Sequence, residues 1–383
     1  MKGLNSKMKE AEKFHIKYKG KIQLALKAPL NKKTLALAYT PGVGEISLKV
    51  ASNKKLTNFL TNRGNTIAII TDGSAVLGLG NVGPEAALPV MEGKAALFKK
   101  FGGIDAIPIV LNTQKAHEII RVVKNIAPSF SGINLEDISA PKCFDIEEKL
   151  DKELPIPVFH DDQHGTAVVV LAALMNALRI KKKNKNVSVV ISGAGAAGTA
   201  ITKLLLAYGF KNITVCDSRA IIENSRKDLN KYKKEIAKLT SPKIKGNCLN
   251  AYKNADVFIG VSAPNILKAA MIKTMAKNPI IFALANPEPE IKPHLAKKTG
   301  AFIVATGRSD FPNQINNVLA FPGIFRGALD SRTKTITYQM KIAAAKALAS
   351  YIKKPTKNHF IPSIFDKNLT SVIAKAVSKA ASK

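Results

Sequence analysis

Two adjacent carboxylates, Asp161 and Asp162, are the residues of this sequence that most directly suggest chemistry. They follow a short apolar run that starts at Pro157, and an apolar segment follows them beyond Gly165. This order is typical of a strand that ends at a site and leads into a helix packed on the sheet. Paired carboxylates beside a sheet edge are costly unless a cation or a catalytic task keeps them there. The alternative is that the aspartates only cap the helix.

A second acidic pair, Glu136 and Asp137, stands at the end of another expected strand within residues 131–139. An expected strand at 104–111 and an expected helix at 113–127 precede it, which is the pattern of a parallel sheet. Both acidic pairs should therefore reach the same sheet edge. Converging carboxylates without a cluster of cysteine and histidine suit a hard divalent ion, Mg²⁺ or Mn²⁺.

Lys94 is a candidate for proton transfer. It lies among apolar residues of a helical pattern that begins near Pro89, after a glycine-rich segment at 71–83. A lysine in such surroundings either extends its amine to water or is held in a site with a lowered pKa. Tyr39, in a turn predicted by Pro41, is either a core tyrosine or a site residue.

A dinucleotide-binding fingerprint follows an expected strand at 187–191. The motif has the form G-x-G-x-x-G and lies at the expected start of a helix. Its candidate cofactor-binding residues are Gly193, Gly195, Ala196, Ala197 and Gly198. The next expected strand, 213–216, ends on Asp217, which can accept the ribose 2′-hydroxyl and so favours NAD over NADP. Arg219 would suit a 2′-phosphate and keeps NADP open.

Further strands are expected at 257–261, 279–283 and 301–305. Asn286 and Asn317 follow strand ends, where a side-chain amide could bind a carboxylate or a carboxamide. The alternative for an isolated asparagine is that it forms a turn.

The order of elements predicts an α/β fold in two domains, which suits a length of 383 residues. We expect an N-terminal α/β catalytic domain with a parallel sheet over residues 1–163. A Rossmann-like dinucleotide-binding domain with C-terminal helices should follow over 164–383. Residues 1–35 are expected to form a lysine-rich helical arm.

Composition narrows the setting of the protein. Three cysteines without metal-type spacing predict a reduced, cytoplasmic protein, and the apolar run at 166–178 is too short to span a bilayer. The formal charge is +32, yet only 8 of the 59 basic residues are arginine, the usual reader of bases and phosphates. Solvated lysine-rich faces are therefore favoured over nucleic-acid binding, with steering of anionic substrates as a by-product.

Together these segments resemble the malic enzyme family in its short bacterial form. The resemblance rests on YTPGV at 39–43, TDGSAVLGLGNVGPEAALPVMEGKAALF at 71–98, NLEDIS at 134–139, FHDDQHGTA at 159–167, GAGAAG at 193–198, ANPEPE at 285–290 and FPGIFRGALD at 321–330. It implies oxidative decarboxylation of L-malate to pyruvate and CO₂, with reduction of NAD or NADP. It also implies a homodimer or larger assembly, with the N-terminal arm placed near the partner's active site.

The resemblance assigns roles to individual residues. It implies that Lys94 is the general base, Tyr39 the general acid and Asp161 an aspartate beside the lysine. The metal ligands implied are Glu136, Asp137 and Asp162. Asn286 and Asn317 correspond to asparagines on the substrate or nicotinamide side. Ala75 stands where larger eukaryotic members have an arginine that binds a substrate carboxylate.

Three alternatives compete with this hypothesis. A malolactic reaction, from malate to lactate with bound NAD, would use a similar set of residues. A plain 2-hydroxy-acid dehydrogenase would not need the clustered carboxylates. A basic nucleic-acid-binding protein on a vestigial nucleotide fold would bind DNA with a steep salt dependence and show no metal-dependent turnover.

Overall fold

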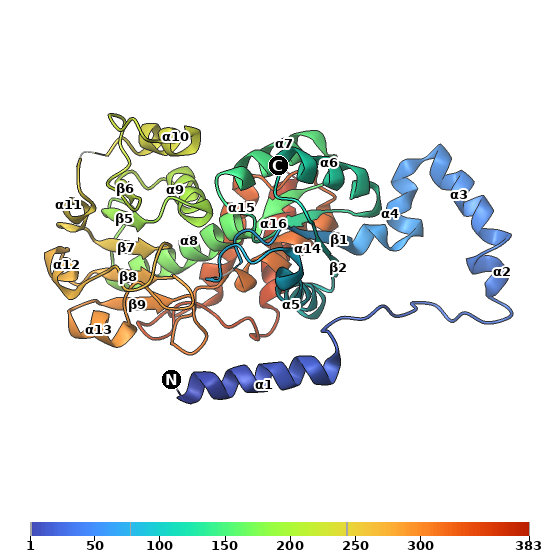
Figure 1. The fold of residues 1–383 in the computed structure, drawn as a ribbon, viewed down its shortest axis with the longest axis horizontal. Coiled ribbons are helices and arrows are strands. Elements are labelled where there is room, and N and C mark those ends of the chain that lie inside the picture. Colours follow the sequence, from blue (N-terminus) through green and yellow to red (C-terminus); the bar gives the residue numbers. More distant parts are fainter. Residues whose placement is uncertain (1, 77, 243, 383) are drawn as a thin grey trace.

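The chain folds around two β-sheets that lie side by side (Figure 1). The computed structural model describes residues 2–76, 78–242 and 244–382. The first sheet has the order β2-β1-β3-β4 and consists of β1 (Thr66–Thr71), β2 (Asp105–Val110), β3 (Ile133–Leu135) and β4 (Val158–His160). The second has the order β6-β5-β7-β8-β9 and consists of β5 (Val189–Ser192), β6 (Ile213–Cys216), β7 (Val257–Gly260), β8 (Ile280–Ala283) and β9 (Ile303–Thr306).

Every pair of neighbouring strands in both sheets is parallel, so the predicted α/β fold class is confirmed. The strands coincide closely with the predicted apolar runs, except that β3 is shorter than the stretch predicted for it. Runs of β-branched and apolar residues mark these strands because a parallel sheet is covered on both faces.

Helices cover both faces of the first sheet, as the alternation along β1 shows. Ile67 and Ile69 belong to a core shared with α5 and α14, whereas Ala68 and Ile70 belong to a core shared with α6 and α7. These helices are α5 (Pro84–Gly102), α6 (Ala116–Ile126), α7 (Lys142–Glu153) and α14 (Phe321–Ser331). A short 3₁₀ helix, η3 (Ala127–Ser129), follows α6.

The second sheet is covered in the same way. Val189 and Ile191 of β5 face the core that holds α8 and α9, and Val190 faces the core that holds α11 to α13. The helices of this half are α9 (Ala196–Tyr208), α10 (Lys231–Thr240), α11 (Cys248–Tyr252), α12 (Ala269–Thr274) and α13 (Pro293–Lys298).

A single helix, α8 (Asp161–Lys181), leads from the first sheet to the second and packs on both α9 and α15. By length and composition α8 could cross a membrane, but 72% of its apolar window is buried inside the protein, as in a core helix. The predicted domain boundary, between residues 163 and 164, falls within its first turn. The two halves are therefore joined by a continuous helix, without a linker at that point.

The C-terminal helices return to the first half of the molecule. They comprise α14, α15 (Tyr338–Tyr351) and α16 (Leu369–Ala381), preceded by the 3₁₀ helix η4 (Asn317–Leu319). Phe321 and Phe325 of α14 pack against Phe98 of α5, with ring centroids 4.6 and 5.3 Å away. The largest core of the described chain consequently includes residues of both sheets.

The N-terminal segment extends away from the two sheets (Figure 1). It contains α1 (Lys2–Tyr18), α2 (Leu35–Ala38), α3 (Gly42–Ser52), η1 (Lys54–Leu56), α4 (Thr57–Leu60) and η2 (Asn62–Asn65). The expectation that residues 1–35 are helical holds only for α1, because residues 19–34 form no helix. Gly20, at φ +120°, and Pro29 interrupt the helical pattern there.

Candidate active site

The two acidic pairs predicted at strand ends meet at one edge of the first sheet. β3 and β4 are neighbours, with Leu135 aligned to His160, so the residues after each strand converge. The Asp137 backbone N–H donates to Asp162 Oδ2 at 2.8 Å. One carboxylate oxygen from each of Glu136, Asp137 and Asp162 can be chosen so that all three lie within 4.8 Å of one another. This spacing suits a single cation held between them.

Lys94 reaches the same cluster from α5. Its side chain is only 7% exposed, and its Nζ lies 2.9 Å from Glu136 Oε1 and in contact with Asp161 Oδ2. The amine also lies over the ring of Phe321, 4.0 Å from the centroid. The sequence left open whether the Lys94 amine extends to water or is held inside a site. Its burial excludes the extension to water.

The charge state of Lys94 differs from the sequence-based expectation of a lowered pKa. Burial does lower the pKa of Lys94, but the negative charges of Asp161, Glu136 and Asp162 outweigh it and raise the pKa above its usual range. In the protein chain alone, the amine is therefore protonated at neutral pH. Loss of that proton requires the neighbouring negative charge to be neutralised.

The acidic side chains of this cluster are too close together and too deeply buried for all of them to be ionised in the protein chain alone. Burial, Asp162 and Glu136 together raise the pKa of Asp137 to about 9. Burial raises the pKa of Asp161 to about 6, against the opposing effect of Lys94. Buried oxygens of both side chains, Asp137 Oδ2 and Asp161 Oδ1, have no hydrogen-bond partner among the described residues. Buried acceptors without donors are what a cation site requires.

Helix capping does not account for the acidic pair at the start of α8. The N-cap residue is His160, and no side chain caps the helix there. Asp161 and Asp162 lie in the first turn but interact with Lys94, Asn317 and the backbone of Asp137. The alternative interpretation of these aspartates as capping residues is therefore wrong.

Asp137 has a backbone conformation that is uncommon for its type. Its φ is +52°, in the left-handed region, directly after the end of β3. Such conformations cost on the order of 1–3 kcal/mol and persist where the surroundings fix them. Two hydrogen bonds of the backbone hold Asp137 in this conformation. Its N–H donates to Asp162 Oδ2 at 2.8 Å, and its carbonyl accepts from the Ala75 N–H at 2.9 Å.

Glu147 is a residue that sequence reasoning missed. From α7, its Oε1 accepts a hydrogen bond from the His160 backbone N–H at 2.7 Å. Its Oε2 lies 2.9 Å from Gln163 Nε2 and 3.0 Å from His164 Nε2. Burial acts to raise the pKa of Glu147, but His164 and Lys341 outweigh it and lower the pKa to about 2. A single carboxylate thus holds the segment that carries Asp161 and Asp162.

A second missed contact ties the glycine-rich segment to the acidic edge. Asp72, fully buried after β1, pairs with Lys142 of α7 at 2.5 Å. Ser74 Oγ donates to Asp72 at 2.6 Å and accepts from the Ser139 N–H at 2.9 Å. The turn after β1 is thereby fixed against the loop after β3.

The two predicted asparagines have different surroundings. Asn317 donates to Asp161 Oδ2 at 2.6 Å, so it belongs to the cluster. Asn286 lies half-buried in the loop after β8, where its backbone closely approaches Gly78. A Cβ at Gly78 would lie 2.6 Å from the Asn286 carbonyl oxygen. The glycine-rich segment of the first half therefore meets the loop of the second half here.

The G-x-G-x-x-G motif forms the expected turn between β5 and α9. Gly193 has a φ of +114°, and a Cβ at Gly198 would lie 1.8 Å from the Gly193 carbonyl oxygen. Gly195 is the N-cap of α9, and a Cβ there would meet open space. The helix N-terminus, with Ala196 and Ala197 in its first turn, is thus open to a pyrophosphate.

Asp217 directly follows β6, as predicted, but its carboxylate is already engaged. Its side chain is 6% exposed and pairs with Arg226 at 2.9 Å and Lys233 at 2.7 Å. Burial acts to raise the pKa of Asp217, and the hydrogen bonds from Arg226 and Lys233 outweigh it, so the pKa lies well below its usual range.

Tyr39 is not brought to this cluster. It lies between α2 and α3 in the extended N-terminal segment, and 68% of its surface is exposed. The interpretation of Tyr39 as a core residue is therefore wrong.

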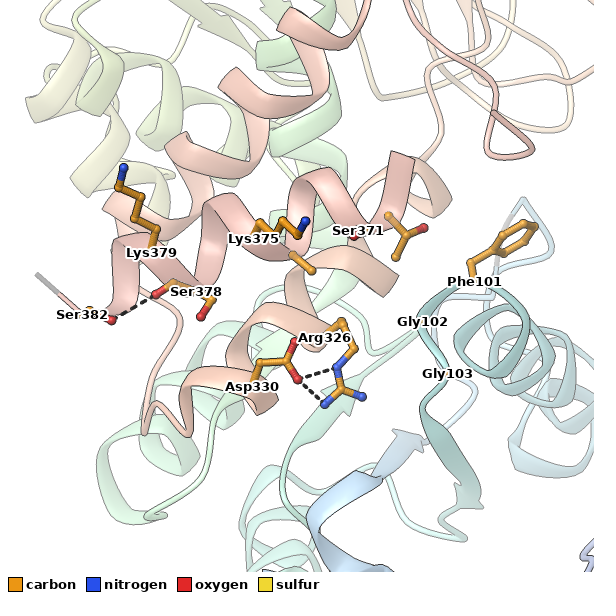
Figure 2. A pocket seen from close by; sticks show the side chains of 12 residues that line it. Phe101, Gly102, Gly103, Arg326, Asp330, Ser371, Lys375, Ser378, Lys379 and Ser382 are labelled. Carbon is orange, nitrogen blue, oxygen red and sulfur yellow. Dashed lines mark hydrogen bonds and ion pairs between the residues drawn. The ribbon is translucent and has the colours of Figure 1, made fainter. Parts of the chain in front are cut away.

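A separate pocket of about 690 Å³ lies between the end of α5, α14 and α16. Figure 2 shows Arg326 paired with Asp330 in this pocket, with Lys375 and Lys379 on the α16 side. None of the predicted site residues lines it.

The chain matches both domains of one enzyme family. Residues 19–151 match the malic enzyme N-terminal domain, and residues 163–382 match the malic enzyme NAD-binding domain. The bifunctional malic/malolactic enzyme of Bacillus subtilis is 53% identical over 378 residues, 97% of this chain and 92% of that protein. The NAD-dependent malic enzyme of Geobacillus stearothermophilus is 53% identical over 367 residues, 94% of this chain and 77% of that protein.

A solved structure gives the same result. The NAD-dependent malic enzyme of Thermotoga maritima superposes with a TM-score of 0.93 at 51% identity, covering 96% of this chain and 98% of that one. Other relatives, including one from Halomonas elongata at 44% identity, are named NADP-dependent malic enzymes. The resemblance stated from the sequence is confirmed over both halves of the molecule. The chain belongs to the malic enzyme family.

Proposed function

We propose that this protein catalyses the oxidative decarboxylation of L-malate to pyruvate and CO₂, with reduction of NAD or NADP. The observation that carries the proposal is the buried contact of Lys94 with Asp161 and Glu136 beside a cluster of three carboxylates. A hard-cation site next to a tunable amine suits removal of a hydroxyl proton and stabilisation of charge on the product side. Relatives above 50% identity are named as malic enzymes, which supports the same reaction.

Glu136, Asp137 and Asp162 would hold Mg²⁺ or Mn²⁺. The buried Asp137 oxygen without a donor and the pKa of Asp137 near 9 fit a group that awaits a cation. When bound, the cation would polarise the C2 oxygen of malate, stabilise the enolate and, by neutralising the carboxylates, lower the pKa of Lys94.

Lys94 would take the C2 hydroxyl proton. Glu136 and Asp161 fix the position of Nζ, and Asn317 in turn holds Asp161. The amine is thus oriented before substrate arrives, and its reactivity depends on the charge of the neighbouring carboxylates. The amides of Asn317, which contacts Asp161, and of Asn286, in the loop after β8, would bind the substrate or the nicotinamide carboxamide.

The open helix N-terminus at α9 would bind the pyrophosphate of the dinucleotide, at Gly193, Gly195, Ala196, Ala197 and Gly198. The nicotinamide supplies the hydride acceptor when it is bound.

Tyr39 would protonate the C3 carbon of the enolate, in the active site of a second copy of this chain. Its own arm is extended, and its large apolar side chains are exposed, among them Leu24, Leu26, Leu37 and Leu48. Exposed apolar residues in such number mark an interaction surface. A homodimer in which each arm completes the partner's site would bury them and bring a tyrosine to Lys94.

Subunit mixing tests the shared site directly. Tyr39→Phe and Lys94→Ala each remove one catalytic group, so each pure protein should be nearly inactive. Mixed dimers would contain one site with both groups intact, and random pairing would restore about a quarter of the activity. If each chain instead used its own Tyr39, no mixed dimer would have an intact site, and mixing would restore nothing.

The reaction itself is tested by following reduced nicotinamide with purified protein, L-malate, Mn²⁺ and either NAD or NADP. Stoichiometric pyruvate and reduced cofactor, abolished by a chelator, are expected. A malolactic reaction is the second candidate, because the Bacillus subtilis relative is named a bifunctional malic/malolactic enzyme. It would give lactate without net reduced cofactor. A small-molecule enzyme of this kind, with reduced cysteines, fits the cytoplasm.

A further inference from the structure

Two of the three cysteines lie together at the end of β6. Cys216 is the last residue of β6 and is 1% exposed, whereas Cys248, the first residue of α11, is partly exposed. Both side chains belong to the core on the α11 to α13 side of the second sheet. Cys143 lies apart from them, in the core shared by α6 and α7. The described chain therefore brings one pair of thiols together.

The Cys248 sulfur lies against the peptide that follows Cys216. Its thiol donates to the Asp217 carbonyl oxygen, with an Sγ–O distance of 3.5 Å. The segments around the two cysteines are also joined through their backbones. Cys216 forms an isolated bridge with Ile221, whose N–H donates to the Gly246 carbonyl at 3.0 Å. The fold thus holds the two thiols next to each other.

The two thiols differ in reactivity. The hydrogen bond between them raises the pKa of the Cys216 thiol, and burial raises that pKa further. The same hydrogen bond lowers the pKa of Cys248, against the opposing effects of burial and the Asp217 charge. Because the thiolate is the nucleophile, Cys248 is the reactive member of the pair, with protonated Cys216 beside it. A partly exposed thiol of lowered pKa next to a second thiol is the arrangement of redox-sensing cysteines.

We propose that Cys216 and Cys248 form a reversible redox pair, in which Cys248 reacts with a hydroperoxide and Cys216 converts the product to a disulfide. The proposal goes beyond the proposed function, since no step of the malate reaction uses either thiol. It also fits a protein with free cysteines, because disulfides that form in a reducing compartment are mostly transient and redox-sensing.

The chemistry balances with the hydroperoxide as the two-electron oxidant. The Cys248 thiolate attacks one peroxide oxygen, the O–O bond breaks, and with H₂O₂ the hydroxide that leaves takes a proton to become water. Cys248 is then a sulfenic acid. The Cys216 sulfur attacks the Cys248 sulfur, its S–H proton goes to the departing hydroxyl, and a second water leaves as the S–S bond forms. A dithiol reverses the reaction by exchange and itself becomes a disulfide.

The pair adjoins the dinucleotide motif. Ser192 of β5 is aligned with Cys216, and the Gly193 N–H donates to the Cys216 carbonyl at 2.9 Å. A disulfide draws two sulfurs closer than a hydrogen bond holds them, so the backbone of Cys216 or of α11 must move. Because Gly193 is bonded to that backbone, we expect the disulfide to weaken dinucleotide binding. This consequence rests on the proposed function, whereas formation of the disulfide does not.

The test exposes the full-length protein to H₂O₂ after reduction with dithiothreitol and removal of the reductant. The remaining thiols are alkylated under denaturing conditions and mapped by mass spectrometry. Two of the three thiols should be lost, and one peptide should join Cys216 to Cys248. Dithiothreitol should restore both thiols. Cys143→Ala is the matched control and should form the same cross-link.

Alkylation of both Cys216 and Cys248 after peroxide, or a disulfide that joins either of them to Cys143 or to a second chain, would overturn the proposal. Single variants identify the thiol that reacts first. In Cys216→Ala, Cys248 should stop at the sulfenic acid, which dimedone labels. Labelling of Cys216 in Cys248→Ala, without labelling of Cys248 in Cys216→Ala, would reverse the assigned order. The cross-link in the unmodified sequence needs neither variant, so an unstable variant does not affect that result.

Titration calorimetry with NAD and with NADP then measures the consequence for the dinucleotide site. The oxidised protein should bind several-fold more weakly than the reduced protein and should recover with dithiothreitol. Cys248→Ala should not respond to peroxide. Equal affinity of the two forms would contradict the link to the dinucleotide site. The cross-link is read without turnover, so a failure of the malate reaction leaves it interpretable.

Discussion

Acidic residues stand at strand ends in both sheets of this molecule, with opposite surroundings. After β3 and β4, Asp137 and Asp161 have buried oxygens without hydrogen-bond donors in the described chain, and their pKa values are raised. After β6, Asp217 accepts five hydrogen bonds, and its pKa is lowered. At the first edge the acidic groups outnumber the single lysine that contacts them, whereas at the second edge the cations Arg219, Arg226 and Lys233 outnumber the carboxylates Asp217 and Asp228.

The difference shows that the role of a strand-end carboxylate is set by the donors around it. An edge that leaves carboxylates uncompensated is suited to a cation from solution. At the other edge, the negative charge of Asp217 is already paired with arginine and lysine side chains of the same chain. The most exposed cation there, Arg219, faces solvent. The topological position is the same in both sheets, and the chemistry differs because of side chains from helices packed beside them.

The largest effect should follow from removing one of the proposed metal ligands at the first edge. Asp162→Ala should lower turnover by more than about 100-fold, because even residues that only support metal ligands contribute 10- to 100-fold. Stimulation by Mn²⁺ should disappear with it, as measured by titrating the metal into the assay. Asp228→Ala at the second edge is the matched control and should retain the metal response. Normal Mn²⁺ stimulation of Asp162→Ala would show that the cation binds elsewhere.

Loss of the amine at the first edge should come next. Lys94→Ala is expected to lower kcat by about 10²- to 10⁴-fold, the usual contribution of a general base. Dinucleotide binding, measured by calorimetry, should be kept, because the amine lies at the carboxylate cluster. Lys99→Ala removes an exposed lysine of the same helix and should leave kcat unchanged. Parallel loss of dinucleotide binding in Lys94→Ala would contradict the assigned role.

Glu147 sharpens the comparison because it holds in place the segment that carries Asp161 and Asp162, through its contacts with His160, Gln163 and His164. Glu147→Gln weakens the hydrogen bonds to His160 and His164, so the affinity for Mn²⁺ should fall by about 10- to 100-fold. Saturating metal should recover most of kcat, which separates positioning from catalysis. Glu148→Gln, at the exposed neighbouring position, serves as the control. A kcat that stays low at saturating metal would mean that Glu147 does more than position the ligands.

The smallest effects are opposite pH trends in stability, measured as the melting temperature in chelator. The pKa of Asp137 is raised to about 9 in the folded state, whereas the unfolded chain loses this proton near pH 4. Between about pH 4 and 9 the folded state therefore holds one proton more than the unfolded chain. The contribution of Asp137 to the free energy of unfolding therefore falls as the pH rises through that window. Asp137→Asn should make the melting temperature less dependent on pH there. The pKa of Asp217 is lowered, so its contribution is present above pH 4 and is lost in acid.

Asp217→Asn should accordingly cost stability at neutral pH and cost less near pH 3. Each change should shift the melting temperature by a few degrees. Melting curves in which both variants respond to pH with the same sign would remove the contrast between the two edges.

The strands and the acidic edge could be predicted because their signals are local. Apolar runs that stop at polar residues identify strands of a covered parallel sheet, and the parallel order brings Glu136 and Asp162 to one edge. Glu147 could not be found in this way. It belongs to an acidic and lysine-rich helical stretch that is typical of a solvated face, and only the packing of α7 turns it toward His160.

Charge states were harder to predict than positions. The raised pKa of Lys94 depends on three carboxylates from two segments, Glu136 after β3 and Asp161 and Asp162 at the start of α8, which the fold brings to the helix that carries the lysine. The saturation of Asp217 depends on side chains 9 and 16 residues further along the chain, Arg226 and Lys233. The location of Tyr39 depends on an arm that has few contacts with its own chain, which no local pattern reveals.

Helix α8 has a mechanical consequence. Its first turn holds Asp161 and Asp162, and its body lies in the core that the second sheet shares. Because α8 is continuous between the halves, any movement of the second half that carried this helix with it would also displace the carboxylates of its first turn. The halves expressed as separate polypeptides would lose this linkage along with part of their shared interior.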